Sequence, residues 1–560
     1  MPRQNFFLVG SESDHVTLDI SGTEDLEDLK RDLASAFSIC NPKTVSFHDA
    51  QGTAELASAK SILDHSGLVG IKVSGNAVRS PYGPRELPFV GHHFQLYPDY
   101  LGNIDRLFER YGSVIKTVNM GTTTYLTNDP LVSEAVLSES PYFTKTTSDP
   151  GHPLFFMQNQ TALFTCDTTS PAFKVSHKFV PPSLAPRAVR CYIGIMQRAI
   201  EQSYGVFDEL DANGKAFNVY QYMFKMAGQI IYRVVLGLDV GHFTTMDTRP
   251  HRIIVLLGEY MQLMKKTSLQ PRWYRYLPFG EHRRVGEMRQ RIFALIQRAM
   301  DEAPIAEDGG ADLPMHEAAV RASCVADYLR RAVDEEGNKL PKEYRLSNTV
   351  SLVGAGFVTS ASLLSWLLYS LTHYPGHQER LLQELVDHAP PPDEAWDYDV
   401  VTSLPFLDSF VKETHRMHNP SFQTARNVKA DVVLPGGWLV PAGSIVIPPF
   451  PSLHKSPDQW ENPGRFDPDR WLDGRDQPRR HRMAYTPFAA GPRGCIGYTL
   501  ATLEAKLCIA NLVHRYEFVD ASREPVEYDP EFLVIRPLNF YVRARRRSNW
   551  PPKSASTASL

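Results

Sequence analysis

A long stretch without charged side chains constrains the fold of this sequence more than any other feature. No Asp, Glu, Lys or Arg occurs between Arg345 and Glu379, and this length would suffice for a membrane span. Serine recurs along the stretch, however, and Gly354 and Gly356 flank Ala355 near its middle. A membrane span is therefore the weaker interpretation, and we expect a long helix buried through a protein core.

A second constraint is a glycine-rich segment that contains one cysteine, residues 487–497 (PFAAGPRGCIG). Apolar residues at helical spacing follow it, so Cys495 lies just before a predicted helix. Free backbone N–H groups and the helix dipole favour a thiolate there. Glycines let the backbone approach a large flat group, and Arg493 could pair with an acid on that group. A haem-thiolate loop fits these features, whereas a structural cysteine in a turn fits the cysteine alone.

The complete spacing of this segment is more specific than its cysteine. It runs Phe488, Gly491, Arg493, Cys495, Gly497 and resembles the haem-binding signature of the cytochrome P450 family. The resemblance covers about residues 80–545 and implies haem b with Cys495 as the axial ligand of the iron. It also implies a mainly α fold with small β-sheets, in which the haem lies between the uncharged helix and the cysteine loop.

Two further motifs occur in the family's order. Glu413 and Arg416 lie three residues apart in a predicted helix and can pair on one face. An ordinary surface pair would look the same and would contribute little. Together with Arg470, from the segment FDPDRW, they resemble the Glu-x-x-Arg and Phe-x-Pro-x-Arg motifs of the family. The resemblance implies a buried charge cluster that locks the cysteine loop behind the haem.

The resemblance also implies cationic side chains that hold the haem propionates. His177 stands where the family has a Trp-x-x-x-Arg/His segment, with Phe173 in place of the tryptophan. Arg426 falls where a propionate-binding arginine often occurs, and Arg493 is the third cation. The missing indole N–H would leave more of this contact to His177, for which an ordinary polar role is the alternative.

Residues 355–360 (AGFVTS) resemble the family's oxygen-activation motif. Ala355 and Gly356 would leave room for a diatomic ligand, and Thr359 would hydrogen-bond its distal oxygen. A packing notch of small residues is the simpler alternative. Val358 departs from the motif, because most monooxygenases of the family carry a proton-relaying acid at that position. Ser360, Thr359 or ordered water could carry the relay instead.

Composition limits the remaining possibilities. With 560 residues, 42% hydrophobic and 22% charged, the chain fits a soluble globular protein with one large domain and a smaller one. A net charge of −4 gives no reason to expect a nucleic acid partner. Its six scattered cysteines fit a reducing compartment with one functional thiolate. The apolar residues 6–9 are too few for a signal peptide or a transmembrane anchor, so we expect a cytoplasmic protein and leave peripheral membrane contact open.

Four regions are expected along the chain. Residues 1–75 show strand patterns at 6–9, 15–20, 44–47 and 69–73, a turn at 10–14, and a helix that begins at Thr23. This small α+β pattern resembles a ubiquitin-like β-grasp module, with either a stabilising or a docking role. Residues 76–91 form a proline-rich hinge, a stiff spacer like the one that precedes the catalytic domain in eukaryotic members. The haem domain is expected over 92–547, with strands at 432–439 and 444–447, and a disordered tail over 548–560.

The resemblance implies a monooxygenase that inserts one oxygen atom from dioxygen into a small apolar or aromatic substrate. The chain shows no flavin or ferredoxin domain, so we expect electrons from NAD(P)H through a separate flavoprotein reductase. The hinge hints at secondary metabolism. Pocket walls are predicted at 155–163, 253–264, Phe357 and 420–424.

Two alternatives stay open. An atypical member could rearrange hydroperoxides, couple phenols or reduce nitric oxide, because Val358 replaces the usual acid. A haem protein without catalytic activity could instead sense or carry a gas; the Thr359 motif argues against it.

Overall fold

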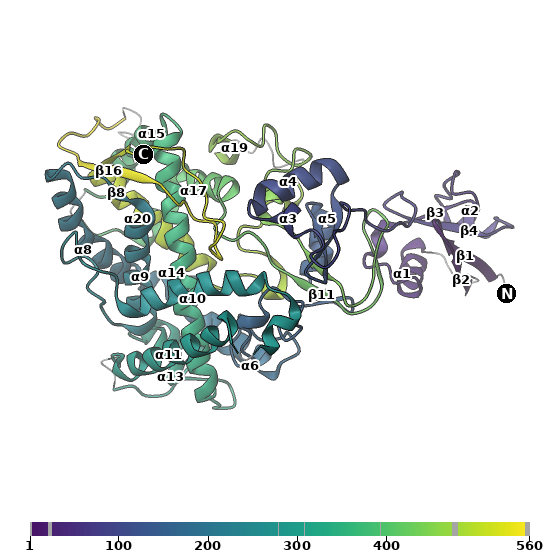
Figure 1. The fold of residues 1–560 in the computed structure, drawn as a ribbon, viewed down its shortest axis with the longest axis horizontal. Helices are drawn as coiled ribbons and strands as arrows, with labels where there is room; N and C mark the ends of the chain where they lie inside the picture. The colour runs from purple at the N-terminus through teal and green to yellow at the C-terminus, as the bar shows by residue number, and fades with distance from the viewer. Residues whose placement is uncertain are drawn as a thin grey trace. The chain divides into compact units, whose positions relative to one another are not determined.

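A computed structural model describes residues 3–20, 25–277, 279–306, 309–391, 394–472 and 480–554. The chain divides into two compact units, each made of three segments. Unit one consists of Met1–Pro153, Gln423–Leu453 and His481–Gly494, and unit two consists of Leu154–Phe422, His454–Arg480 and Cys495–Leu560. Figure 1 shows the elements of both units in chain order by colour.

Unit one begins with a small α+β module. Its strands β1 (Arg3–Leu8), β2 (Ser11–Asp19), β3 (Val45–His48) and β4 (Val69–Val73) form a sheet in the order β2-β1-β4-β3. β1 pairs parallel to β4 and antiparallel to β2. The helix α1 (Leu26–Ala36) buries Leu29 and Leu33 in the same core as Phe6 and Ile71. The small α+β module that the strand pattern predicts is therefore present, and its likeness to a β-grasp module stays a prediction.

Two details of the module differ from the prediction. Residues 11–14 belong to β2 and not to a turn, because Gly10 (φ +94°) allows a tighter turn. The predicted helix start at Thr23 lies outside the described residues; the described helix is capped by Asp25, whose carboxylate accepts a hydrogen bond of 2.9 Å from the Glu27 amide.

A β-hairpin of unit one is paired with the module on one edge and with the hinge on the other. Residues 432–439 were expected as one strand, but Gly436 and Gly437, both at positive φ, divide them into β12 (Val432–Leu434) and β13 (Trp438–Val440). On the β12 edge, the Val433 amide donates to Ser38 O (2.9 Å) and Val433 O accepts from Cys40 N (3.1 Å). On the β13 edge, Arg79 exchanges backbone hydrogen bonds with Gly437 O and the Leu439 amide.

Side chains strengthen this junction. The Arg79 guanidinium lies 4.1 Å above the Trp438 ring, and Val433 packs in the hydrophobic core of the module. The hairpin therefore has partners along both edges, which would otherwise present unpaired N–H and C=O groups.

The hinge is not a free spacer. It lies along β5 (Val114–Asn119), where the Lys116 amide donates to Tyr82 O (2.9 Å) and the His92 ring bridges Pro84 O and the Val118 amide. A Cβ at Gly83 or Gly91 would overlap a carbonyl of this strand. β5 is the edge of a five-stranded sheet in the order β5-β6-β14-β11-β7, with β6 (Thr122–Thr127), β14 (Ile445–Ile447), β11 (Arg426–Val428) and β7 (Phe143–Thr144).

Unit two is built around α14 (Lys342–His373), a helix of 32 residues. It packs against α9 (Val219–Leu236), α11 (Glu281–Glu302), α17 (Pro405–Met417) and α20 (Tyr498–Arg515), and Figure 1 shows it running between them. Within the described residues it is the one helix long and apolar enough to cross a membrane, and 67% of its most apolar window is buried inside the protein. Its serines find partners in the fold; Ser365, for example, donates to Ala361 O (2.6 Å).

Unit two has further elements. Among them are the helices α6 (Pro171–Phe179), α8 (Ile193–Ala212), α10 (Arg252–Ser268) and α15 (His377–His388), and a sheet of β15 (Tyr516–Asp520), β16 (Tyr541–Arg546) and β8 (Phe217–Asn218). Residues 548–554 of the expected disordered tail lie against α15 and α20, where the Trp550 indole donates to His514 O (2.8 Å) and Ser554 N to Asp387 (2.7 Å). Residues 555–560 lie outside the described part.

Removal of residues 1–79 should lower the thermal unfolding midpoint and increase aggregation, because both edges of the β12–β13 hairpin lose their partners. Scanning fluorimetry with light scattering measures both effects. Gly437→Val, which brings a side chain against Ala77 O, should shift the midpoint in the same direction without a truncation. An unchanged midpoint in both variants would contradict the structural role of the junction.

Candidate active site

Cys495 stands two residues before Gly497, the N-terminal cap of α20. Its thiol is exposed, yet the surrounding protein atoms desolvate it enough to raise its pKa, against a hydrogen bond from the Gly497 amide that lowers it. The expected bias toward thiolate is therefore wrong for the protein chain alone. A metal ion at the sulfur would reverse this balance, because a coordinating thiol is deprotonated outright.

The residues of the cysteine segment that precede Cys495 lie in unit one. Gly491 (φ +71°) is needed for close packing, because a Cβ there would overlap Leu137 O. Gly491 therefore allows a close contact with α5 (Pro130–Leu137), and its approach to a large flat group stays a prediction. Phe488 is half-buried, and Arg493 is half-buried and close enough to Arg426 to lower the pKa of that residue.

Arg426 is a buried cation that fits an anionic group. It begins β11, is fully buried, and its Nε lies 2.9 Å from Glu139 Oε1. Burial lowers its pKa to about 10, Glu139 opposes this shift and Arg493 adds to it. Its Nη2 has no hydrogen-bond partner among the described residues. A buried guanidinium with an unsatisfied N–H and a second arginine nearby is what a haem propionate requires.

His177 lies on α6, where its exposed ring is 5.4 Å from the ring of Phe173. The residue expected to replace a tryptophan thus packs directly on the histidine, which fixes its orientation. The contact of His177 with a propionate stays a prediction.

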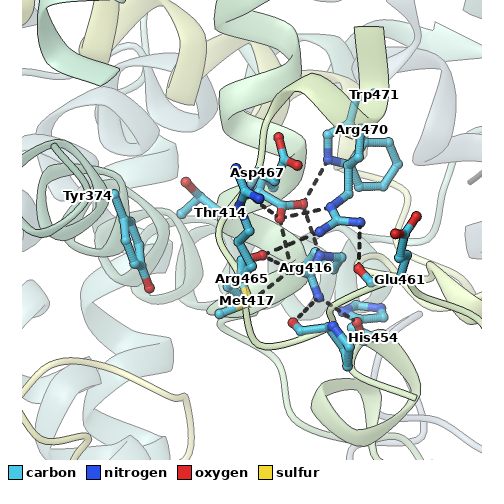
Figure 2. A network of polar contacts seen from close by, with 12 residues as sticks. Tyr374, Thr414, Arg416, Met417, His454, Glu461, Arg465, Asp467, Arg470 and Trp471 are labelled. Atoms are coloured by element: carbon cyan, nitrogen blue, oxygen red, sulfur yellow. Dashed lines mark hydrogen bonds and ion pairs between the residues drawn. The ribbon is translucent and has the colours of Figure 1, made fainter. Parts of the chain in front are cut away.

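The predicted charge cluster is present and buried. Arg416 binds Glu413 through two hydrogen bonds (Nε–Oε2, 2.9 Å; Nη2–Oε1, 2.8 Å), and Arg470 Nε donates to the same carboxylate (3.1 Å). Glu413 and Arg416 are completely buried and Arg470 nearly so. The Trp471 indole and the Asp467 amide also donate to Glu413 (3.0 and 2.9 Å), and Figure 2 shows Arg416, Arg470 and Trp471 converging.

The remaining donors of the two arginines bind backbone carbonyls. Arg416 donates to the carbonyls of His454 (3.1 Å), Pro463 (2.8 Å) and Arg465 (2.9 Å), and Arg470 donates to Glu461 O (3.2 Å). The cluster thereby fixes the irregular segment 454–471 to α17, as Figure 2 shows. Its charges are both paired and hydrogen-bonded, which a buried cluster requires.

The oxygen-activation motif lies in the middle of α14. Ala355 is exposed and Thr359 half-buried, although the residues between and around them are largely buried. Thr359 Oγ1 donates to Ala355 O (2.8 Å), one helical turn earlier, which leaves the oxygen free to accept a hydrogen bond. These two side chains therefore mark the open face of the helix.

Gly356 has a packing role that the sequence did not predict, and its part in making room for a diatomic ligand stays a prediction. A Cβ at this position would lie 2.5 Å from Ile231 Cδ1 on α9, so the glycine allows two helices to approach. Phe357 likewise packs in the core, edge-to-face against Phe224 (4.9 Å between ring centroids), and not on a pocket wall.

Ser360 of α14 contacts a buried acid that was not predicted from the sequence. Val358 is buried, and Ser360 Oγ donates to Glu504 Oε2 on α20 (2.9 Å). Burial raises the pKa of Glu504 to about 8, while the bond from Ser360 lowers it. Its Oε1 has no partner within the described part of the chain. Glu504 is the one acidic residue in the otherwise largely apolar helix α20, and this pattern could have identified it as a candidate functional residue.

The comparisons agree with this geometry. The Cytochrome P450 family profile matches residues 81–544. The chain belongs to the cytochrome P450 family. A cytochrome P450 monooxygenase, alnD from Emericella nidulans, is 51% identical over 557 residues, which is 99% of this chain and 100% of the relative. Cytochrome P450 4F5 from Rattus norvegicus is 28% identical over 65% of this chain and 70% of its own length.

A solved structure supports the fold. The cytochrome P450DA haem domain superposes with a TM-score of 0.73 at 23% identity and covers 84% of this chain and 98% of its own length. The N-terminal module precedes the family profile but falls within the region shared with the Emericella relative. The protein is thus a P450 monooxygenase, an oxidoreductase of a family with a haem-thiolate cofactor.

Glu413→Gln should destabilise the protein by about 3–5 kcal/mol, because two buried guanidinium groups lose their counter-charge. Chemical denaturation followed by circular dichroism measures the change. Arg190→Gln is the matched control; it breaks an exposed pair with Asp399 (2.6 Å) and should leave the free energy of unfolding nearly unchanged, because solvent screens the pair. Equal effects of the two substitutions would show that the cluster contributes no more than a surface pair.

Proposed function

We propose that this P450 monooxygenase holds haem b through the sulfur of Cys495 and oxygenates an apolar or aromatic organic substrate. Electrons come from NAD(P)H through a separate flavoprotein reductase in the cytoplasm. The observation that carries the haem assignment is the buried, unsatisfied Nη2 of Arg426, together with the exposed Cys495 thiol ahead of α20. Arg426 and Arg493 would hold the propionates, with His177 as a third candidate.

Bound haem supplies the oxygen chemistry, and electron donation from a thiolate favours cleavage of the O–O bond. The chain has to deliver protons to that reaction. Thr359 Oγ1 is held by Ala355 O, so its lone pairs face outward as acceptors. Ser360, the next residue, carries its hydroxyl to Glu504. Because its pKa is raised to about 8, Glu504 is protonated at neutral pH and can donate.

The Ser360–Glu504 pair helps to decide whether the enzyme is an ordinary monooxygenase or an atypical member of the family, the question that Val358 raises. Hydroperoxide rearrangement and related reactions need less proton delivery, so a missing acid would favour them. Glu504, a buried acid whose pKa is raised, accepts a hydrogen bond from Ser360, two residues after Val358, and this contact supports ordinary monooxygenation. The Ser360–Glu504 contact equally argues against a haem protein that only senses or carries a gas.

The purified protein, reduced and exposed to carbon monoxide, should give the red-shifted Soret band of a thiolate-ligated haem. Cys495→Ala should abolish this band because the axial sulfur is lost. Cys191→Ala is the matched control, since Cys191 is also exposed but lies on α7 (Pro186–Cys191). An imidazole-like spectrum in the wild type, or an intact band in Cys495→Ala, would overturn the assignment.

Activity assays of the purified wild-type protein distinguish monooxygenation from hydroperoxide rearrangement. With a reductase and NAD(P)H it should form a product that carries one oxygen atom from dioxygen. Full turnover of a hydroperoxide in the absence of any reductase would favour the rearrangement reaction instead.

A further inference from the structure

A cavity of about 460 Å³ lies at the C-terminal end of α20, within unit two. Its walls come from the end of α15, from the last turn of α20 at His514, and from residues of the segment 546–553. His514 is about 24 Å along α20 from Tyr498, so the cavity lies at the opposite end of this helix from Cys495. A cavity of this volume suits a small organic molecule.

The walls are fixed by hydrogen bonds to the end of α20. Arg547 donates from its backbone N–H to Arg515 O (2.9 Å) and from its Nε to Val513 O (3.0 Å). The Trp550 indole donates to His514 O (2.8 Å). Three carbonyl groups that the helix itself leaves unpaired are thus satisfied, and the segment that follows β16 is held against the helix.

Cationic side chains line this cavity. They are Arg515, Arg546, Arg547 and Lys553, and no acidic residue is among the described residues of its lining. Asp208 pairs with two of them, at 3.3 Å from Arg515 and 3.0 Å from Arg546. In the described part of the chain, Arg547 and Lys553 have no carboxylate partner. The cavity therefore carries positive charge that the surrounding residues do not compensate.

Two nitrogen-bearing side chains at the cavity are buried without a full set of partners. Arg547 is half-buried; burial lowers its pKa, whereas the charges of Glu517 and Glu379 raise it. Its Nη groups have no hydrogen-bond partner among the described residues. His514 is only 5% exposed, and its Nδ1 likewise has no partner there. Buried groups of this kind indicate a missing ligand, and an anion would supply the acceptor that a guanidinium lacks.

The remaining lining is apolar. It consists of Leu385, Val386, Ala389 and Pro390, at the end of α15 and just after it. The Trp550 ring stands edge-to-face to the His514 ring, with 6.5 Å between centroids, and is 42% exposed although its N–H is bonded. A flat apolar group can therefore reach this indole from solvent and pack against it.

We propose that this cavity binds a small organic anion, with its carboxylate or phosphate bound by Arg547 and a flat apolar body packed against Trp550 and the end of α15. Lys553 adds positive charge at the same place. The site is separate from the haem site, because α20 lies between it and Cys495. The ligand is thus a second small molecule and not the substrate, and the proposal does not rest on the function proposed above.

The test is isothermal titration calorimetry of the full-length haem-loaded protein at pH 7 with 2-naphthyl phosphate, 2-naphthoate and inorganic phosphate. A naphthyl anion should bind about tenfold more tightly than inorganic phosphate, because only the naphthyl compounds reach the apolar wall. The tighter of the two naphthyl compounds identifies the anion that the site prefers. Arg547→Gln should weaken binding of that compound about tenfold, because the charged fork is lost.

Arg545→Gln is the matched control. It removes the same charge from β16, but Arg545 is exposed and does not line the cavity, so the variant should bind as the wild type does. Ala389→Phe fills the cavity without a change of charge and should also weaken binding about tenfold. The carbon monoxide band should be the same in all three variants, so failure of the haem assignment and failure of this proposal are distinguishable.

Three results would overturn the proposal. The wild type could bind neither naphthyl anion, or it could bind both no more tightly than inorganic phosphate. Arg547→Gln could bind no more weakly than Arg545→Gln, which would indicate a general effect of surface charge. If Arg547→Gln does not fold, Ala389→Phe decides, because unchanged binding in that variant would place the anion outside the cavity.

Discussion

Burial of α14 is the constraint on which the rest of unit two depends. A helix of 32 residues with no charge over most of its length must be covered, and each neighbour meets it through a specific feature. The absence of a side chain at Gly356 allows α9 to approach closely. Ser360 donates a hydrogen bond to Glu504 on α20, and the Trp366 indole donates one to Ile535 O. The exception is the face of Ala355 and Thr359, which stays open. The face of α14 that we propose to be catalytic is therefore the part that the fold leaves uncovered.

The sequence was a good guide wherever a pattern is local. The buried helix, the helix after Cys495, the Glu413–Arg416–Arg470 cluster and the strands of the N-terminal module all follow from spacing and order. It was a poor guide where two distant segments meet. Gly356 and Gly491 owe their role to Ile231 and Leu137 O. The hinge pairs with a strand, and Glu504 acquires its raised pKa only in contact with Ser360. None of these partners is apparent from residue spacing.

At Val358, the sequence motif and the structural contacts give complementary information about proton delivery. The sequence shows that the usual acid is missing from α14, and the structure places the buried carboxyl of Glu504, whose pKa is raised, on the adjacent helix, where it accepts a hydrogen bond from the residue after Thr359. A buried acid and the hydroxyl that donates to it can thus belong to different helices, provided that their packing is fixed. Here it is fixed by the burial of Ser360 and Glu504, which are 4% and 1% exposed. The hydrogen bond from Ser360 satisfies one oxygen of this buried carboxyl and lowers the desolvation cost of its burial.

The central claim is that Glu504 supplies protons through Ser360, and its most direct test is the yield of oxygenated product per NAD(P)H consumed. Glu504→Gln should reduce this coupling about tenfold or more with the carbon monoxide band intact, and Val358→Glu in that background should restore part of it. Glu531→Gln, at an exposed acid, should leave coupling unchanged. Equal coupling in Glu504→Gln and the wild type would contradict the account.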